Sequence, residues 1–476
     1  KIAGYEEGDS VICDSHAAIT QTVEQRRVPI VQDALQALSH PLVDVVIDAT
    51  GVPAAGAELG MASLEAGKHL VMMNVEADVT VGAIMQDIAA RKGLVYTIGA
   101  GDEPSSVMEM YDWVTALGYP VIAAGKGKNN AFRVDAVPDD YREEAERRNM
   151  NPRMLVEFVD GSKTMVEMAA IANATGLVPD IPGMHGPKAT VSELATTLIP
   201  IEDGGVLSRT GCVDYSVGKG VSPGIFVIIK AKHTRIHERF ADLKMGEGPY
   251  YAFHRPYHLT SLEVPLSAAR AVLYGRNDMV PLAKPVADVC AVAKNDLKAG
   301  EVLDSIGEYC YRSWAMSVSD ARKADAIPCG LLERGVCKSD VKKGDWKLKI
   351  QMQVMGLPNV AEEDFKADST GLVLFEVDNK MRATEKDFIG TWEYRHDGAI
   401  HRRTFLADHT AIYFCNGEQL DDFDEATWKV ENNTLILKMP PLAGYRDEEL
   451  YERHFLRDRK ELIFETLPYR NGSRVK

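Results

Sequence analysis

Hydrophobic residues in the first part of the chain alternate between short apolar runs and longer segments with helical spacing. The runs at 43–51, 69–74 and 94–98 are rich in β-branched residues and bounded by turn residues, as in strands buried on both faces of a parallel sheet. Helical spacing occurs at 15–40, around 60–64 and at 81–92. Strands that alternate with helices predict βαβ units. Residues 1–120 are therefore predicted to form a doubly wound, Rossmann-like parallel sheet of the α/β class.

The middle of the chain has a different pattern. Apolar runs at 121–125, 155–158 and 224–232 predict strands, and the spacing at 162–174 predicts an amphipathic helix. Residues 121–284 are therefore predicted to form an α+β substrate and oligomerisation domain. Short β runs then continue over 285–355, with turns at 296–301 and 341–345, and 356–387 is predicted to be a loop-rich linker.

The last segment, 388–476, contains short strands separated by turns at 396–398 and 431–433. The predicted strands lie at 391–395, 401–406, 411–414, 427–430, 434–438 and 461–465. This spacing is typical of a small antiparallel sandwich or barrel. We expect Trp392 and Trp428 to form its core. No residues in it have catalytic spacing, so it is interpreted as a binding or assembly module whose removal leaves turnover intact.

Composition excludes several classes of function. The 476 residues carry a net charge of −16, which argues against a nucleic-acid-binding surface. The sequence contains no run of 18 or more apolar residues, so it predicts no membrane span. The 7 cysteines are scattered without a C-x-x-C pair, which indicates reduced thiols and no zinc site. We expect a cytoplasmic protein with a small-molecule partner.

A parallel sheet that binds a dinucleotide ordinarily begins with a strand that leads into G-x-G-x-x-G. No such motif precedes Val43, and Gly99–Pro104 has proline where the third glycine belongs. The latter is predicted to be a substrate-side loop. We expect the first strand and its glycine loop to lie outside this chain, and this segment alone to bind NADPH or NADH poorly.

Several blocks of sequence resemble a known family. Residues 43–51, 67–75, 99–106 and 125–130 resemble the homoserine-dehydrogenase-like NAD(P)-dependent oxidoreductases that carry a C-terminal SAF module. The blocks 75–80, 139–142, 161–168 and 253–263 are similar to a subgroup of them, a second type of sugar-phosphate reductoisomerase. The resemblance covers residues 10–350. It implies NADP or NAD as cofactor, a homo-oligomer, and a SAF-like module at 285–355. It also places the cofactor at Ala49, Thr50, Gly51, Asn74, Glu76 and Gly99.

Two loops that follow predicted strands carry the strongest candidate chemistry. In Gly125–Asn130, Lys126 and Lys128 are predicted to be catalytic, with Asn129 and Asn130 binding substrate; the alternative is a solvated basic turn. In the other loop Asp102 and Glu103 are suited to holding Mg²⁺ or Mn²⁺, or to moving a proton. The alternative is a plain helix cap. Ligands bind at the carboxyl ends of parallel strands, so we expect both loops to face one cavity.

Further candidates lie on predicted helices and strand ends. Ser105 and Ser106 are predicted to bind substrate or to cap a helix. Lys163 and Glu167, four residues apart, share a helix face and form either a catalytic pair or a simple ion pair. The resemblance puts Glu167 near the position of the family's catalytic lysine. The remaining candidates form a polar cluster with either a catalytic and phosphate-binding role or a structural one, and they are His254, Arg255 and His258. His185 and Lys219 are weaker candidates of the same kind.

Three functions remain open on the sequence. The first is NAD(P)H-dependent reduction of a sugar-like or sugar-phosphate carbonyl compound, with or without a metal-assisted rearrangement. The second is a plain dehydrogenase of a branched or carboxylated sugar. The third is a non-catalytic scaffold that retains the fold, since fold alone does not give function.

Overall fold

The computed structural model describes residues 8–130, 132–333 and 335–344 and a series of shorter segments beyond them. These segments are 350–351, 360–367, 373–377, 385–396, 399–420, 426–431, 434–439, 450–457, 461–464 and 472–474. The turns predicted at 397–398 and 432–433 lie outside the described residues. By its internal contacts the chain separates into two units, Lys1–Leu348 and Lys349–Lys476.

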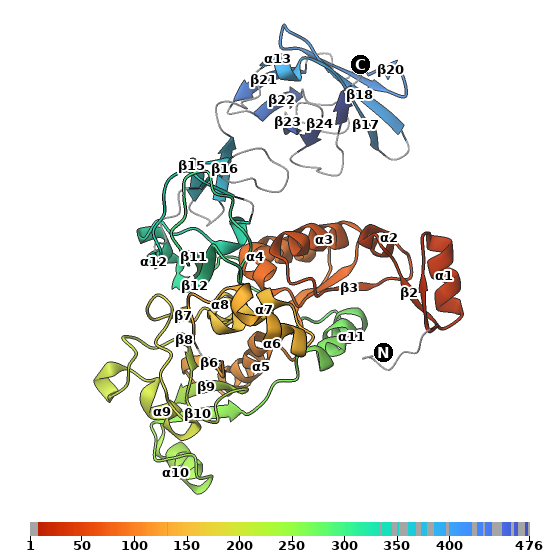
Figure 1. The fold of residues 1–476 in the computed structure, drawn as a ribbon. Coiled ribbons are helices and arrows are strands. Elements are labelled where there is room, and N and C mark those ends of the chain that lie inside the picture. The colour runs from red at the N-terminus through yellow and green to blue at the C-terminus, as the bar shows by residue number, and fades with distance from the viewer. Residues whose placement is uncertain are drawn as a thin grey trace. The chain divides into compact units, whose positions relative to one another are not determined.

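The predicted parallel sheet is present in the first unit. Its strands β3 (Val45–Asp48), β4 (His69–Met72) and β5 (Tyr96–Ile98) pair in parallel in that order. Helices α3 (Pro53–Glu65) and α4 (Val75–Arg91) connect them (Figure 1). Their apolar faces form a buried core, which includes Leu64, Leu70, Met72, Met85 and Tyr96. The α/β fold class is therefore confirmed.

Residues 15–40 do not form the single helical segment that their spacing predicted. Helices α1 (His16–Glu24) and α2 (Ala34–Leu38) flank a strand, β2 (Val28–Ile30), which pairs in parallel with β1 (Ser10–Ile12). Pro29 explains the break, because proline lacks the N–H that a helix interior needs. The helical spacing was thus correct for two short helices but did not reveal the strand between them.

A mixed five-stranded sheet follows, in the order β10-β9-β6-β8-β7. Its strands are β6 (Val121–Gly127), β7 (Val178–Pro179), β8 (Cys212–Ser216), β9 (Ile225–Lys230) and β10 (Tyr250–Arg255). Helices α5 (Glu103–Ala116) and α8 (Ser162–Thr175) contact each other and this sheet. The smaller helices around it are α6 (Arg142–Arg147), α7 (Pro152–Val159), α9 (Leu194–Thr197), α10 (Thr234–Asp242) and α11 (Val264–Tyr274).

The prediction of a strand at 155–158 was wrong, because these residues belong to α7. Asn151 caps that helix by accepting from the N–H of Arg153, and Pro152 occupies its first turn. Leu155, Val156 and Val159 are buried, which is the spacing of one helix face. A four-residue apolar run by itself cannot distinguish a strand from one turn of a buried helix.

The last part of the first unit is a small β module anchored to the helices. It contains the hairpin β11 (Ala287–Ala293) and β12 (Tyr311–Ser317), then α12 (Val318–Lys323) and β13 (Val336–Cys337). Lys294 is fully buried, forms an ion pair with Asp160 at 2.7 Å, and donates to the carbonyls of Ala136 and Glu308. Because Asp160 stands just before α8, this pair ties the module to the start of that helix.

The second unit is an antiparallel β structure. Residues within the predicted linker form a hairpin of β15 (Val360–Ala367) and β16 (Val373–Val377), after β14 (Ile350–Gln351). The helix α13 (Glu385–Phe388) precedes a nine-stranded sheet in the order β20-β19-β18-β17-β25-β24-β23-β22-β21. Its strands are β17 (Gly390–His396), β18 (Ala399–Phe405), β19 (Ala411–Cys415), β20 (Glu418–Gln419), β21 (Thr427–Glu431), β22 (Thr434–Met439), β23 (Leu450–Arg457), β24 (Glu461–Phe464) and β25 (Gly472–Arg474).

This sheet closes on itself as a barrel. An antiparallel bridge joins Thr410, next to β19, to Thr427 at the start of β21. Two backbone hydrogen bonds flank the bridge, from Ala411 to Ala426 at 3.0 Å and from Trp428 to His409 at 2.9 Å. Closure removes the unpaired edges that an open sheet would expose. As expected, Trp392 and Trp428 are buried in the core of this unit.

Among the described residues, no helix is both long and apolar enough to cross a membrane.

The buried Asp160–Lys294 pair generates a stability prediction. Replacing Lys294 with Met should lower the free energy of unfolding by about 3–5 kcal/mol, because it leaves a buried carboxylate without its partner. The double variant Asp160→Asn/Lys294→Met should lose less than Lys294→Met alone, since it removes both charges. Urea denaturation followed by circular dichroism measures both.

The matched control is Lys298→Met, in the same module. Lys298 pairs with Asp340 on the surface, with 71% and 54% of the two side chains exposed. Exposed pairs contribute little to stability. Equal effects of Lys294→Met and Lys298→Met would contradict the anchoring role of the buried pair.

Candidate functional site

Three elements of the first unit bring charged side chains together. Asp102 and Glu103 stand where the loop after β5 enters α5, and Asp102 makes no capping hydrogen bond with its side chain. Lys126 lies in β6 itself, not in a loop as predicted, and Lys128 follows the strand. Glu167 comes from the middle of α8.

Two glycines of β6, Gly125 and Gly127, allow its backbone to pack closely against neighbouring backbone. A Cβ on Gly125 would lie 1.6 Å from the carbonyl oxygen of Asp214, and one on Gly127 would lie 2.2 Å from the nitrogen of Ser222. Neither position can therefore accept a side chain without moving the backbone. Lys126 and Lys128 line the same pocket.

That pocket has a volume of about 310 Å³, near the lower end of ordinary small-molecule sites. It is lined by Asp102, Glu103, Lys126, Gly127, Lys128, Asn129, Asn130, Arg148, Phe158, Lys163, Thr164, Glu167, Ser222, Pro223, His258 and Thr260. The structure thus brings the two predicted loops to one cavity, together with both residues of the predicted pair on α8 and one histidine of the later cluster.

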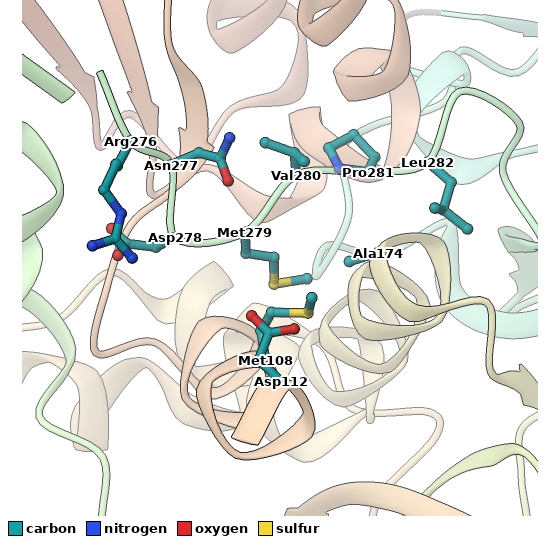
Figure 2. Close-up of a pocket in the computed structure, with 10 residues that line it drawn as sticks. All are labelled: Met108, Asp112, Ala174, Arg276, Asn277, Asp278, Met279, Val280, Pro281 and Leu282. Atoms are coloured by element: carbon teal, nitrogen blue, oxygen red, sulfur yellow. The ribbon is translucent and has the colours of Figure 1, made fainter. Parts of the chain in front are cut away.

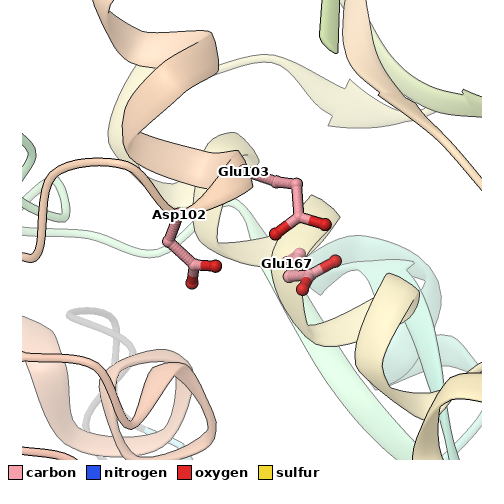
Figure 3. A group of neighbouring side chains, drawn as sticks. All are labelled: Asp102, Glu103 and Glu167. Carbon is pink, nitrogen blue, oxygen red and sulfur yellow. The ribbon is translucent and has the colours of Figure 1, made fainter. Parts of the chain in front are cut away.

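Three carboxyl groups lie close together in the pocket, and two of them bind one ammonium group. Asp102, Glu103 and Glu167 each offer an oxygen atom within 4.8 Å of the others (Figure 3). The Nζ of Lys126 donates to Glu103 at 2.6 Å and also to Glu167. On the other side of Glu103, the Nε2 of His258 lies 3.3 Å away. Pro223 fixes the histidine ring, because its carbonyl oxygen lies 2.8 Å from Nδ1.

Burial and charge give these carboxyl groups different protonation. Burial and the neighbouring Glu103 raise the pKa of Asp102 well above its usual value. Burial also works to raise the pKa of Glu103, but Lys126 and His258 outweigh it and hold that pKa well below the ordinary value. For Glu167, burial and Glu103 raise the pKa to about 7. Glu103 is therefore the group most readily ionised, and Asp102 binds its proton more tightly than an ordinary carboxyl group.

The lysines differ just as clearly. Burial disfavours the charged form of Lys126, but Glu103 and Glu167 more than compensate and raise its pKa. The pKa of Lys163 is also raised, against burial, by four acids led by Glu76 and Asp102. Burial and the charge of Lys126 instead lower the pKa of Lys128 to about 8. Only Lys128 among the three can exchange a proton readily near neutral pH.

A divalent ion fits this group poorly as it stands. Carboxylate oxygens are suitable ligands for Mg²⁺ or Mn²⁺. However, the ammonium of Lys126 already occupies the position between Glu103 and Glu167, and it satisfies the charge that a metal would balance. An ion at Asp102 and Glu103, as the sequence predicted, would have to displace Lys126.

The pocket connects directly to the parallel sheet. Lys163 donates to Glu76 at 3.0 Å, and Glu76 lies buried in the first turn of α4, just after β4. A side chain of the pocket is thus bonded to the edge at which a dinucleotide binds in such sheets.

The cofactor edge itself fits NAD(P) at the end of β3. Ala49 and Thr50 are exposed there, and Gly51 has a left-handed backbone (φ +65°) that leaves room for a ligand. Helix α3 begins just beyond, with no side chain capping its first N–H groups. An uncapped helix start favours phosphate groups.

Asn74 and Gly99 have structural roles instead of the predicted contacts with cofactor. The amide nitrogen of Asn74 donates to Asp48, Thr50 and the carbonyl of Val52, so its hydrogen-bonding capacity is used in shaping the β3 loop. Gly99 is packed so closely that a Cβ would lie 2.4 Å from the sulfur of Met73.

Four predicted substrate or catalytic residues lie outside the pocket lining. Ser105 is buried in α5 and donates to the carbonyl of Gly99 at 2.6 Å, and Ser106 is buried beside it. Neither serine lines the pocket, and their predicted contact with substrate stays a prediction.

The other two belong to β10. The Nε2 of His254 lies 3.2 Å from the carbonyl of Val221, and Arg255 pairs with Glu109 and Glu263. These bonds fix the end of β10, which agrees with the structural role considered for these residues and not with the catalytic one. His185 likewise pairs with Asp180 at 2.7 Å, and Lys219 is exposed; neither lines the pocket.

Several lining residues were not predicted from the sequence. Phe158 lies in α7, which was predicted to be a strand, and Arg148 lies between α6 and α7. Thr164 precedes Glu167 by one turn of α8. Thr260 donates its N–H to the carbonyl of Gly101 at 2.7 Å, which holds the Asp102 loop in place. Only the basic character of Arg148 was a usable signal.

A second cavity, of about 410 Å³, lies between α5, the end of α8 and residues 276–282 (Figure 2). Met108 and Asp112 of α5 line it, and Asp278 on its wall is already paired with Arg270. No predicted site residue reaches it.

Two sequence families match separate parts of the chain. Residues 10–95 match the NAD binding domain of homoserine dehydrogenase, and residues 101–264 match the catalytic domain of oxidoreductase DRL. None of the curated proteins compared with the sequence is similar to it.

Solved structures with related folds are distant. Biliverdin reductase from Synechocystis sp. PCC 6803, in complex with biliverdin and NADP+, is 20% identical over 26% of this chain and 39% of its own, with a TM-score of 0.18. A probable dehydrogenase from Thermotoga maritima is 15% identical over 46% of this chain and 64% of its own, with a TM-score of 0.27.

A putative myo-inositol dehydrogenase from Sinorhizobium meliloti 1021 is 14% identical over 56% of this chain and 82% of its own, with a TM-score of 0.28. The chain thus spans less than two thirds of the first two of these structures. The chain is thus similar to an NAD binding domain over residues 10–95 and to the catalytic domain of an oxidoreductase over residues 101–264, each over less than half of its length.

Proposed function

We propose that the pocket at Lys126 transfers a hydride between NAD(P) and a carbonyl or hydroxyl carbon of a small, anionic, sugar-like substrate. One observation carries this proposal: three lysines and three carboxylates, most of them buried, line one cavity beside the strand ends of the parallel sheet. Perturbed acids and bases in a concave site are typical of catalytic groups. A purely scaffolding protein has no use for so costly an arrangement.

The lining favours a substrate with both hydroxyl groups and an anionic group. Lys128, Arg148 and the amides of Asn129 and Asn130 are among the lining residues, and they can bind a phosphate or carboxylate. Glu167 and Asp102 supply carboxyl groups that can bond to hydroxyl groups, and the pKa of both is raised mainly by burial. A sugar phosphate or a carboxylated sugar combines these features.

The lysines divide the work of the reaction between them. When bound, the nicotinamide ring supplies or accepts the hydride. Lys163 keeps its positive charge and stabilises negative charge that develops on the substrate oxygen. Lys128 donates two N–H groups, to the carbonyls of Asn130 and Phe158, which leaves a third for the substrate. Lys128 then donates a proton to the oxygen in reduction and accepts it in oxidation.

A rearrangement before reduction is the second candidate. It is the activity of the 1-deoxy-D-xylulose 5-phosphate reductoisomerase-like enzymes with a SAF module, which the sequence resembles. The observation that favours it is the group of Asp102, Glu103 and Glu167, whose oxygen atoms could hold a divalent ion. Against it stands Lys126, bonded inside that group. We therefore place oxidoreduction without a metal first.

The role of Lys128 gives a prediction on pH. The Lys128→Met variant should lose roughly 100-fold in kcat/KM for carbonyl reduction, the usual contribution of a general acid. In the unaltered protein, kcat/KM for reduction should fall as pH rises through about 8, because the depressed pKa of Lys128 means that its charged form is lost there. Steady-state rates over pH 6 to 10 measure both effects.

Lys219→Met is the matched control, since Lys219 is exposed and does not line the pocket. That variant should keep the rate and the pH profile of the unaltered protein. An unchanged alkaline limb in Lys128→Met would show that another group donates the proton.

The place of Lys126 gives a prediction on metals. Removing it in Lys126→Met should destabilise the fold by about 3–5 kcal/mol, because it leaves buried carboxylates uncompensated. Mn²⁺ should then bind and raise the melting temperature of this variant, but not that of the unaltered protein. The double variant Lys126→Met/Glu167→Gln should lose most of this response. Stabilisation of the unaltered protein by Mn²⁺, with loss of turnover in a chelator, would favour the rearrangement instead.

A further inference from the structure

Arg153 of α7 lies where three parts of the first unit meet. One nitrogen of its guanidinium, Nη2, donates to the carbonyl oxygen of Gly51 at 2.9 Å. The other, Nη1, donates to the carbonyl of Ile306 at 3.0 Å and to Glu157 at 2.6 Å. Only 14% of the side chain is exposed. These contacts join the parallel sheet, the substrate domain and the small β module.

The first contact holds the loop at the cofactor edge. Gly51 ends the turn after β3, next to the exposed Ala49 and Thr50. The guanidinium nitrogen would lie 3.9 Å from a Cβ at Gly51, so Arg153 supports the side of the loop that faces the protein. A planar fork of donors can bond two carbonyl groups and a carboxylate at once, which an ammonium group cannot do in the same geometry.

The second contact leads to the substrate pocket. Glu157 is buried beside Glu76 and Lys163, with Asp160 also nearby. Glu76 bonds to Lys163, which lines the pocket. A short series of charged groups therefore connects the Gly51 loop with the lysine that is bonded to the strand ends.

We propose that Arg153 is a positioning residue that holds the Ala49–Gly51 loop ready for the cofactor and joins that loop to the charged groups around Lys163. This inference rests on the proposed function, because it assumes that NAD(P) binds at the edge formed by this loop. Arg153 does not line the substrate pocket, and its side chain is largely buried, so it does not present its charge to the cofactor. It acts through Gly51 on one side and Glu157 on the other.

A merely structural role for Arg153 makes a different prediction. If the guanidinium only stabilised the packing of α7, its loss would lower the melting temperature and weaken both ligands alike. A positioning role affects the cofactor selectively, because a misplaced loop costs binding energy at that edge alone. The separation of cofactor affinity from substrate affinity is therefore the decisive measurement.

The experiment compares three variants of the intact protein: Arg153→Met, Arg153→Lys and Arg142→Met. Arg142 is the control, because it forms an exposed pair with Asp139 on the neighbouring helix and carries the same charge. Dissociation constants for NADPH and NADH are measured by fluorescence titration without substrate. The melting temperature of each variant and the KM of the carbonyl substrate are measured in parallel.

We expect Arg153→Met to weaken cofactor binding about tenfold and Arg153→Lys to give an intermediate loss, since lysine replaces the fork with a single charge. Arg142→Met should bind like the unaltered protein, and the KM of the carbonyl substrate should stay within about twofold throughout. Cofactor binding by Arg153→Met as tight as in the unaltered protein would overturn the inference. An equal loss for both ligands would do so as well. Failure of the unaltered protein to bind either nucleotide would instead overturn the proposed function.

Discussion

The ammonium of Lys126, buried between Glu103 and Glu167, is the interaction on which the rest of the site depends. Three carboxyl groups so close together in a buried place cannot all ionise without a compensating charge. Lys126 and His258 hold the pKa of Glu103 below its ordinary value, whereas burial and the neighbouring Glu103 raise that of Asp102. The same positive charge also lowers the pKa of the neighbouring Lys128. One buried lysine thus lowers the pKa of Glu103 and, together with burial, that of Lys128.

The fold provides the rigid support that such a site requires. The groups come from the loop before α5, from β6 and from α8, and α5 contacts both β6 and α8. Buried polar bonds fix these elements: Asp160 with Lys294 at the start of α8, and Arg153 with Gly51 and Ile306. Apolar packing alone tolerates small shifts, whereas paired buried charges lose much of their free energy when displaced. The charge pairs therefore determine position more strictly than the surrounding core does.

The sequence predicted the main features of this arrangement for a physical reason. Asp102 and Lys128 each follow an apolar run that reads as a strand, and strand ends are where open α/β sheets bind ligands. What it could not show was which polar side chains are already bonded within the protein. Ser105, Arg255 and Asn74 have the chemistry of binding residues, yet each is occupied by a neighbour that only the folded chain reveals. Local ambiguity explains the rest: four apolar residues at 155–158 fit a strand as well as a helix turn.

The sequence Gly125-Lys126-Gly127-Lys128 illustrates how environment, more than residue type, determines a role. The glycines bring the backbone of β6 against its neighbours, and both lysines reach one pocket. Lys126 meets two carboxylates and is held charged, whereas burial and the like charge of Lys126 lower the pKa of Lys128 to about 8. Identical residues two positions apart thereby become a fixed charge and a proton donor. Pairs of titratable groups whose pKa values are driven apart in this way distinguish acid–base partners in enzymes. Because the fixed charge of Lys126 adds to burial in lowering the pKa of Lys128, the function of the second lysine depends on the first.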